Sequence, residues 1–198
     1  MKKKLISGLG TIIVIMIIAV FKLGGSTDSQ CPFTVDIDGT AISLNEITVE
    51  ELEKSGYDLL NAGIYEVPKE IDKKTYVDDA ASINKDNMKY ADISVANLSG
   101  SSEKISSCKV IEMKFYYADQ FLMGKTVNTY KEASIDGFNP SGMTKDEVKA
   151  KVTKKITKDE DKTLKVEDGD YYCEYYFDDN GVVNRVEVGL PGYKVKTA

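Results

Sequence analysis

The sequence predicts an α+β protein of two tandem repeats, each a short helix (or helix pair) packed on an antiparallel sheet. Three observations support this class. A helix-start pattern occurs twice, runs of alternating apolar and polar residues follow each copy, and an Asn-Gly pair separates the last two runs. With 198 residues, 42% of them hydrophobic, the chain is long enough for one domain or two small ones with a buried core.

Residues 1–30 are expected to be a signal or membrane-anchor segment and a linker. Three consecutive lysines precede an apolar stretch, and residues 5–23 are near the short end of a membrane span. The lysines favour the cytoplasmic side, so the rest of the chain is expected outside the cytoplasm, on the cell membrane. We favour an uncleaved anchor. Cleavage to a secreted protein and lipid attachment at Cys31 are the alternatives, although the polar run before Cys31 is no lipobox.

The first predicted repeat spans residues 31–128. A small hairpin is expected to turn at Asp38-Gly39, and a capping box of Thr48 and Glu51 then starts a short helix. Alternating residues predict two later strands, each with one buried and one solvated face, at residues 93–98 and 109–117.

The second predicted repeat spans residues 129–198. A capping box of Thr144 and Glu147 starts its helix. This helix is expected to continue to Ile156, because apolar residues recur along one of its faces at helical spacing.

A hairpin at the end of the chain is the strongest strand prediction. Asn180 and Gly181 separate two alternating runs, residues 171–177 and 182–190. A two-residue turn would create an apolar face that covers the helix. The expected facing pairs on it are Cys173 with Val188, Tyr175 with Val186 and Phe177 with Asn184.

Three residues on the opposite, solvated face of this hairpin form a candidate partner-binding patch: Tyr172, Tyr176 and Arg185. Tyrosine and arginine are enriched among the residues that dominate binding energy at protein interfaces. The competing interpretation is ordinary cross-strand packing on a wet sheet face.

The composition argues against several function classes. The chain has no histidine, which removes Ser-His-Asp and Cys-His nucleophiles and the common zinc sites. Arg185 is its one arginine, which argues against phosphate and nucleic-acid recognition. Beyond residue 23, 22 basic residues stand against 32 acidic ones, so the exported part carries a net charge of −10. Such a body is repelled by nucleic acids and anionic surfaces.

The three cysteines leave one unpaired in an exported protein. Cys173 falls on the apolar face of the last hairpin and is expected to be a buried free thiol. We therefore predict a disulfide between Cys31 and Cys108. No metal site and no cofactor are expected, because three thiols without histidine make a poor zinc site and the acidic runs lack EF-hand spacing.

Several motifs resemble a known repeat. Residues 141–148 (Ser-Gly-Met-Thr-Lys-Asp-Glu-Val), followed by residues 172–177 and 182–186, are similar to the repeat unit of the β-lactamase-inhibitor-protein-like fold, which also occurs in small outer-membrane assembly lipoproteins of the SmpA/OmlA type. Residues 95–97 and 107–110 resemble uncharacterised exported proteins of low-GC Gram-positive bacteria. The resemblance implies a protein-binding module rather than an enzyme. The chain has no tryptophan, so the inhibitor's tryptophan-rich concave surface is missing and a β-lactamase target is not implied.

Together these observations predict a membrane-anchored, extracytoplasmic interaction module of the cell envelope that is not an enzyme. Its expected partner is an envelope or secreted protein. The alternative is a secreted carbohydrate-binding protein or hydrolase that uses surface carboxylates and tyrosines. A structural envelope protein that pairs with its own second copy is a third reading.

Overall fold

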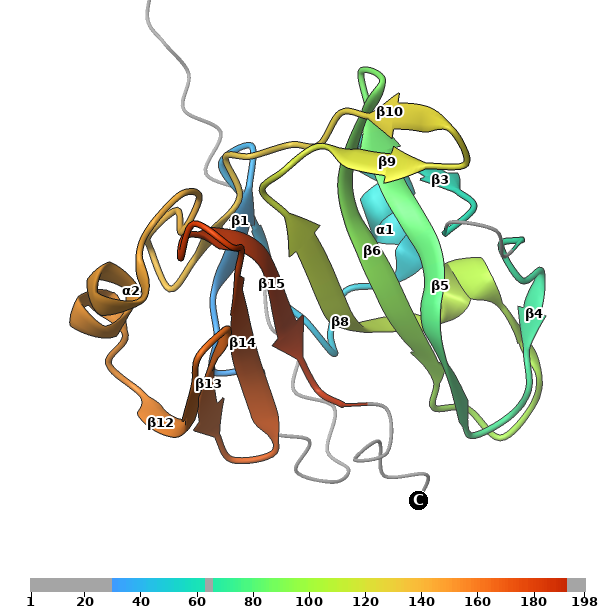
Figure 1. Ribbon diagram of the computed structural model, residues 1–198. Helices are drawn as coiled ribbons and strands as arrows, with labels where there is room; N and C mark the ends of the chain where they lie inside the picture. Colours follow the sequence, from blue (N-terminus) through green and yellow to red (C-terminus); the bar gives the residue numbers. More distant parts are fainter. Residues whose placement is uncertain (1–29, 63–65, 192–198) are drawn as a thin grey trace, which may run out of the picture.

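The molecule is built on one antiparallel sheet of eight strands (Figure 1). The structure is a computed structural model, and it describes residues 30–62 and 66–191. In spatial order the strands are β12 (Lys155–Glu160), β13 (Thr163–Asp168), β14 (Tyr171–Phe177), β15 (Val183–Gly189), β8 (Lys109–Tyr116), β6 (Met88–Asn97), β5 (Thr75–Lys85) and β3 (Asp58–Leu60).

Smaller elements surround this sheet. The helical elements are α1 (Val49–Lys54), α2 (Lys145–Lys151) and the 3-10 turn η1 (Ile105–Ser107). The strands β1 (Val35–Ile37), β2 (Thr40–Ile42) and β11 (Ser134–Ile135) form a three-stranded sheet. Two further pairs are β9 (Gln120–Leu122) with β10 (Lys125–Val127), and β4 (Glu70–Ile71) with β7 (Glu103–Lys104).

The predicted α+β class is wrong, because the protein is mostly β. Strands make up 52% of the structure and helices 10%. The two segments also share one sheet, since β8 of the first pairs with β15 of the second, with Phe115 opposite Val186. The capping boxes predict where helices begin but not how far they run, and the helices they start have only six and seven residues.

Both capping boxes are confirmed. The amide of Glu51 donates to Thr48 Oγ1 at 3.3 Å, and the Thr48 amide donates to the Glu51 carboxylate at 2.7 Å. Thr144 and Glu147 make the same two bonds. The predicted continuation of the second helix to Ile156 is wrong, because that residue lies in β12 opposite Val166.

The last hairpin keeps the predicted register over most of its length. Cys173 lies opposite Val188, and Tyr175 lies opposite Val186, as predicted. The predicted pairing of Phe177 with Asn184 is wrong, because the register shifts after Tyr176 and Phe177 instead pairs with Val183. A bulge of this kind increases the local twist of a hairpin.

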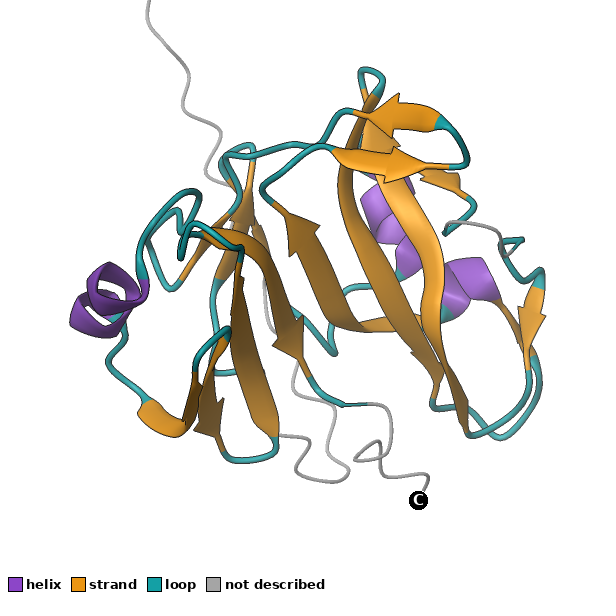
Figure 2. Ribbon diagram, in the orientation of Figure 1, coloured by secondary structure: helices purple, strands orange, loops and turns teal. Residues whose placement is uncertain are grey.

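The apolar face of the large sheet holds the core. The helix α1 lies behind β5 and β6 in Figure 2, and β1, β2 and β11 continue the same layer. Fully buried residues from both halves of the sheet meet there, including Ile93, Met113, Phe115 and Tyr175. Burial of these side chains is the main source of stability. The other face of the sheet is therefore the one left for polar groups.

The predicted membrane span lies outside the described residues, whereas the predicted disulfide lies within them. The helices of the described residues include none that is long and apolar enough to span a membrane, and the predicted span at residues 5–23 lies outside them. All three cysteines do lie within the described part, and they are free thiols, so the predicted Cys31–Cys108 disulfide is not formed. Burial raises the pKa of both thiols to about 11, and their charged neighbours differ: Asp136 and Lys154 for Cys31, Glu103 for Cys108.

Candidate functional site

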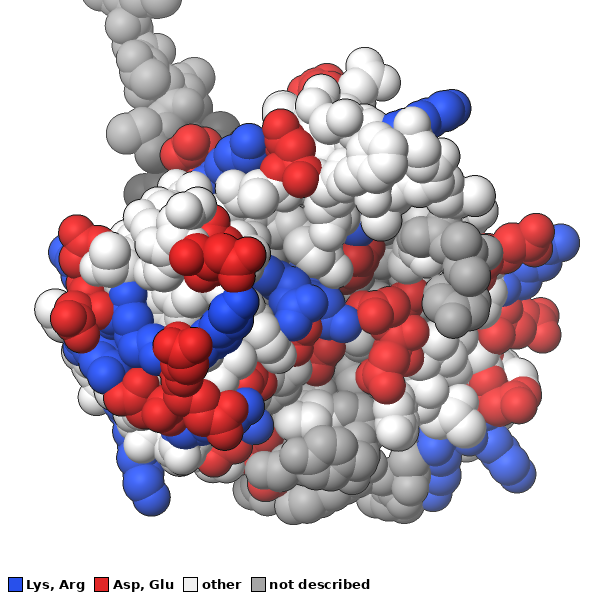
Figure 3. Space-filling view, in the orientation of Figure 1, with Lys and Arg blue, Asp and Glu red and all other residues white. Residues whose placement is uncertain are grey.

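The second face of the eight-stranded sheet is lined by polar side chains in cross-strand register. Figure 3 shows basic atoms at the centre of this face with acidic atoms on both sides of them. One row crosses seven neighbouring strands and consists of Ser82, Asp92, Lys114, Glu187, Glu174, Lys165 and Lys158. Within and beside this row, three tyrosines each combine with one carboxylate and one cation.

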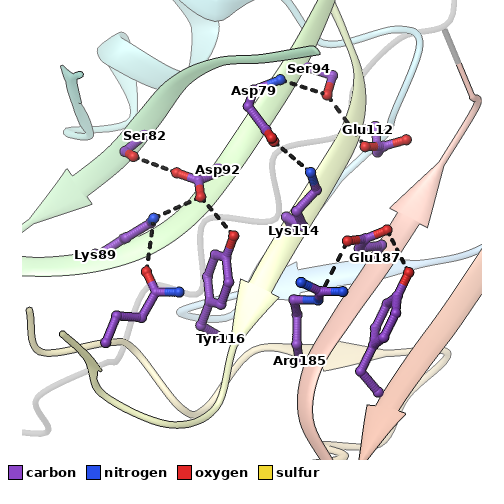
Figure 4. Close-up of polar contacts among 12 residues, drawn as sticks. Asp79, Ser82, Lys89, Asp92, Ser94, Glu112, Lys114, Tyr116, Arg185 and Glu187 are labelled. Carbon is purple, nitrogen blue, oxygen red and sulfur yellow. Dashed lines mark hydrogen bonds and ion pairs between the residues drawn. The ribbon is translucent and has the colours of Figure 1, made fainter. Parts of the chain in front are cut away.

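The Lys89 group consists of Lys89, Asp92 and Tyr116, which point toward one another from β6 and β8 (Figure 4). Lys89 Nζ lies 2.7 Å from Asp92 Oδ2 and 4.6 Å from the centre of the Tyr116 ring, and the Tyr116 hydroxyl donates to Asp92 at 2.9 Å. Lys89 also donates to Gln120 at 3.1 Å, and the Ser82 hydroxyl donates to Asp92. The Lys89 side chain is only 5% exposed. A buried ion pair with this many hydrogen bonds is a structural element.

The Lys165 group consists of Lys165, Tyr172 and Glu112. The Tyr172 hydroxyl donates to Glu112 Oε2 at 2.7 Å, and Lys165 Nζ lies 4.8 Å from the centre of the ring. Burial raises the pKa of Glu112 against the opposing effects of the Tyr172 hydrogen bond and the charge of Lys114. Burial, with the negative charge of Glu112 next, also raises the pKa of Tyr172.

Gly189 makes the contact between Tyr172 and Glu112 possible. It is the residue between them in the sheet, opposite Tyr172 on one side and Glu112 on the other. Its φ is +146°, and a Cβ at this position would overlap the backbone of Ile111. Only glycine fits this backbone. No side chain therefore separates the tyrosine from the carboxylate.

The Arg185 group consists of Arg185, Tyr176 and Glu187. The guanidinium carbon lies 3.8 Å from the centre of the Tyr176 ring, and the Tyr176 hydroxyl donates to Glu187 Oε2 at 3.0 Å. Burial, followed by the negative charge of Glu187, raises the pKa of Tyr176. The nearest oxygen of Glu187 is 3.4 Å from Arg185 Nε, an ion pair without hydrogen-bond geometry.

A pocket of about 430 Å³ opens above the Arg185 group. Its floor is one cross-strand row of four neighbours, Tyr116, Arg185, Tyr176 and Thr163. Its walls come from the segment that enters β9 and from the turn between β12 and β13. We call this the Arg185 pocket. The remaining lining residues are Ala118, Asp119, Gln120, Lys162, Phe177 and Asn184.

Two buried polar atoms in this pocket have no hydrogen-bond partner. They are Thr163 Oγ1 and Arg185 Nε, and they are the only such side-chain atoms in residues 30–62 and 66–191. The other charged groups of the pocket are paired: Lys162 lies 2.5 Å from Asp179, and Asp119 lies 2.9 Å from Lys131. Buried polar groups without partners are uncommon in folded proteins and are expected to meet a ligand or water.

The hairpin of β9 and β10 extends the surface beside the pocket. Asp119 and Gln120 line the pocket, and the residues that follow expose Phe121 and Met123 to 75% and 78%. Large apolar side chains at such exposure are typical of contact surfaces when they lie beside polar groups. The tip of the hairpin therefore offers apolar contacts next to a polar pocket.

The structure brings together two of the three predicted patch residues. Tyr176 and Arg185 share the pocket, whereas Tyr172 is 8% exposed and hydrogen-bonded within the Lys165 group. Sequence reasoning missed Thr163 and Tyr116, because their place depends on which strands are neighbours. In the described part of the chain, no three His, Cys, Asp or Glu side chains lie close enough to hold a metal ion.

No protein-family model matches the chain, and comparisons with curated proteins and with solved structures found no match. The resemblance to the β-lactamase-inhibitor-protein-like fold therefore stays a prediction. The function has to be argued from the site itself.

Proposed function

We propose that the protein is a non-catalytic binding module of the cell envelope, anchored in the membrane by residues 5–23, which recognises an envelope or secreted protein through the Arg185 pocket. The observation that carries this proposal is the pocket itself. It combines a tyrosine and an arginine, both common interface hot-spot residues, with buried polar atoms that lack partners.

The position of the pocket supports this function. Gln30, the first described residue, donates to Glu46, and Glu46 accepts a hydrogen bond from Lys109 at the start of β8. The pocket begins at Tyr116, at the other end of the same strand. Eight residues of strand separate the two ends by about 24 Å. The pocket therefore lies at the end of β8 opposite to the one beside Gln30, where the chain enters the described structure.

The chemistry of the pocket favours binding over catalysis. Glu187 accepts from Tyr176, and Asp119 is paired with Lys131 and accepts from the Thr129 amide. Hydrogen bonding to Lys131, with the Thr129 amide next, lowers the pKa of Asp119. A general acid at neutral pH needs a raised pKa instead. Exposed Phe121 and Met123 add the apolar contacts that a protein interface uses.

The test is a pull-down with full-length proteins that are solubilised in mild detergent and immobilised. Each bait is exposed to extracted envelope proteins and culture supernatant at physiological salt. Wild type is compared with Tyr176→Ala/Arg185→Ala and with Lys158→Ala, which removes one positive charge from the same sheet face outside the pocket. We expect one envelope or secreted protein to be retained by wild type and by Lys158→Ala but not by the double variant. Equal retention by all three baits contradicts the proposal, and retention of glycan alone supports the carbohydrate-binding alternative.

A further inference from the structure

We propose that the Arg185 pocket binds a carboxylate group of the partner, carried by an acidic side chain or by a free C-terminus. This inference rests on the proposed function and adds the chemistry by which the partner is recognised. It follows from three properties of the pocket: which atoms lack partners, how the guanidinium is held, and how much charge surrounds it.

The atoms without partners call for an acceptor. Arg185 Nε can only donate, and within the described residues it donates no hydrogen bond, with Glu187 at 3.4 Å as an ion-pair partner. The Thr163 hydroxyl can donate as well. The two residues are separated in the sheet only by Tyr176, because Tyr176 pairs with Arg185 on one side and with Thr163 on the other. Both residues line the pocket, so a ligand bound in it would lie beside both of them.

The guanidinium is already positioned for such a ligand. It lies 3.8 Å from the centre of the Tyr176 ring, and the hydroxyl of that ring is fixed by Glu187. Stacking uses one face of the guanidinium, and the donors on its edge match the two oxygens of a carboxylate. A cation that is held before binding loses less side-chain entropy when the ligand arrives.

The charged side chains around Arg185 favour a ligand group with one negative charge over a group with two. Glu187 lies 3.4 Å from Arg185, and Asp119 lines the same pocket. The second cation of the pocket, Lys162, is already paired with Asp179. A phosphate group carries between one and two negative charges at neutral pH and would be repelled more strongly by the two carboxylates. A carboxylate carries one.

The single arginine of the chain provides a direct probe. Labelling with [15N]arginine marks Arg185 alone, so its Nε–H gives one NMR signal in the full-length protein in detergent micelles. Three alanine-based peptides are titrated: one with a central glutamate and blocked ends, one with a free C-terminus, and one fully blocked without acid. Inorganic phosphate is the fourth ligand.

We expect at least one of the two carboxylate peptides to shift the Arg185 signal with millimolar affinity, and the fully blocked peptide to leave it unchanged. The arm that binds more tightly identifies the source as a side chain or a C-terminus. Tighter binding of phosphate, or no shift with either acidic peptide up to ~10 mM, overturns the carboxylate assignment. If Tyr176→Ala/Arg185→Ala still abolishes partner retention in that case, the proposed function stands without it.

Two variants separate ligand recognition from a structural role. Thr163→Val removes the unpartnered hydroxyl and keeps the shape of the side chain, so we expect a three- to tenfold weaker peptide affinity with no loss of folding stability. Arg185→Lys keeps the charge but loses the fork, and the same peptide, followed by its own proton signals, should bind about tenfold more weakly. Unchanged affinity in both variants contradicts the inference.

Discussion

The Lys89 group and the Arg185 group are built from the same parts on the same sheet face, yet they differ in what is left to bind. Each combines a tyrosine ring with a cation over it and a carboxylate that accepts from its hydroxyl. Lys89 is almost fully buried and donates to two partners, whereas Arg185 is about one-third exposed and has an unpartnered donor. The same chemistry therefore forms a buried, hydrogen-bonded group at Lys89 and leaves an unpartnered donor at Arg185, where we propose that a ligand binds.

The difference arises from what covers each group. The chain entering β9 lies over Lys89 and supplies Gln120 as an additional acceptor. The same chain forms only a wall beside Arg185. Partial cover leaves the arginine in contact with solvent, and its more numerous donors are harder to satisfy than those of a lysine.

Removal of the carboxylate from the Lys89 group should have the largest effect on stability. Asp92→Ala leaves Lys89 buried without its charged partner and also takes an acceptor from Tyr116. We expect a loss of about 3–5 kcal/mol in the free energy of unfolding, because an uncompensated buried charge is costly. Urea denaturation followed by circular dichroism measures it. A loss below about 1 kcal/mol would show that the Lys89 group is not a structural element.

A smaller loss of stability is expected when the close approach of β15 to β8 is disturbed. Gly189→Ala places a Cβ against the Ile111 backbone at a φ of +146°. We expect destabilisation of about 2–3 kcal/mol from backbone strain and overlap. The matched control is Gly100→Ala, where a Cβ meets nothing within 4 Å. Equal unfolding free energies for both variants would contradict the close approach of β15 to β8.

The contribution of the Lys165 group to folding stability should depend on pH. Burial raises the pKa of Glu112 above its ordinary value of 4.5, so the folded protein binds this proton more tightly than the unfolded chain does. The contribution of Glu112 is then most favourable below pH 4.5 and is lost as the pH rises through its folded pKa. Glutamine does not ionise, so the variant Glu112→Gln does not lose this stability as the pH rises. Its stability relative to wild type should rise between pH 4.5 and neutrality, and a relative stability that falls with pH would refute this account.

Replacement of the hydroxyl beside Arg185 should have the smallest effect on folding. Thr163 Oγ1 is buried without a partner, so Thr163→Val removes a group that stabilises nothing in the ligand-free protein. We expect an unfolding free energy unchanged or raised by up to about 1 kcal/mol. Thermal denaturation in detergent, with wild type alongside, is the measurement. A destabilised variant would indicate a structural hydrogen bond at this hydroxyl.

The local features of the fold, the last hairpin and the two helix starts, are predictable from the sequence. Turn and capping residues act on their immediate neighbours, so Asn180-Gly181 predicted the last hairpin and Thr48 and Thr144 predicted both helix starts. Alternation also assigned Tyr176 and Arg185 to one polar face.

The remainder depended on contacts between distant segments. Nothing local specifies that β8 pairs with β15, which joins the two predicted repeats into one sheet. The exposure of Tyr172 was predicted wrongly, because its burial follows from a glycine on the neighbouring strand that opens a path to Glu112. Thr163 entered the pocket through the pairing of β13 with β14, which periodicity could not assign.

The most direct test of the comparison makes one substitution in both groups and measures the free energy of unfolding. Lys89→Met and Arg185→Met remove the two cations while keeping a long apolar side chain. We expect a loss of about 3 kcal/mol or more for Lys89→Met, because Asp92 is left buried without its charged partner, and of about 1 kcal/mol or less for Arg185→Met. Equal losses would contradict the division between a structural group and a binding group.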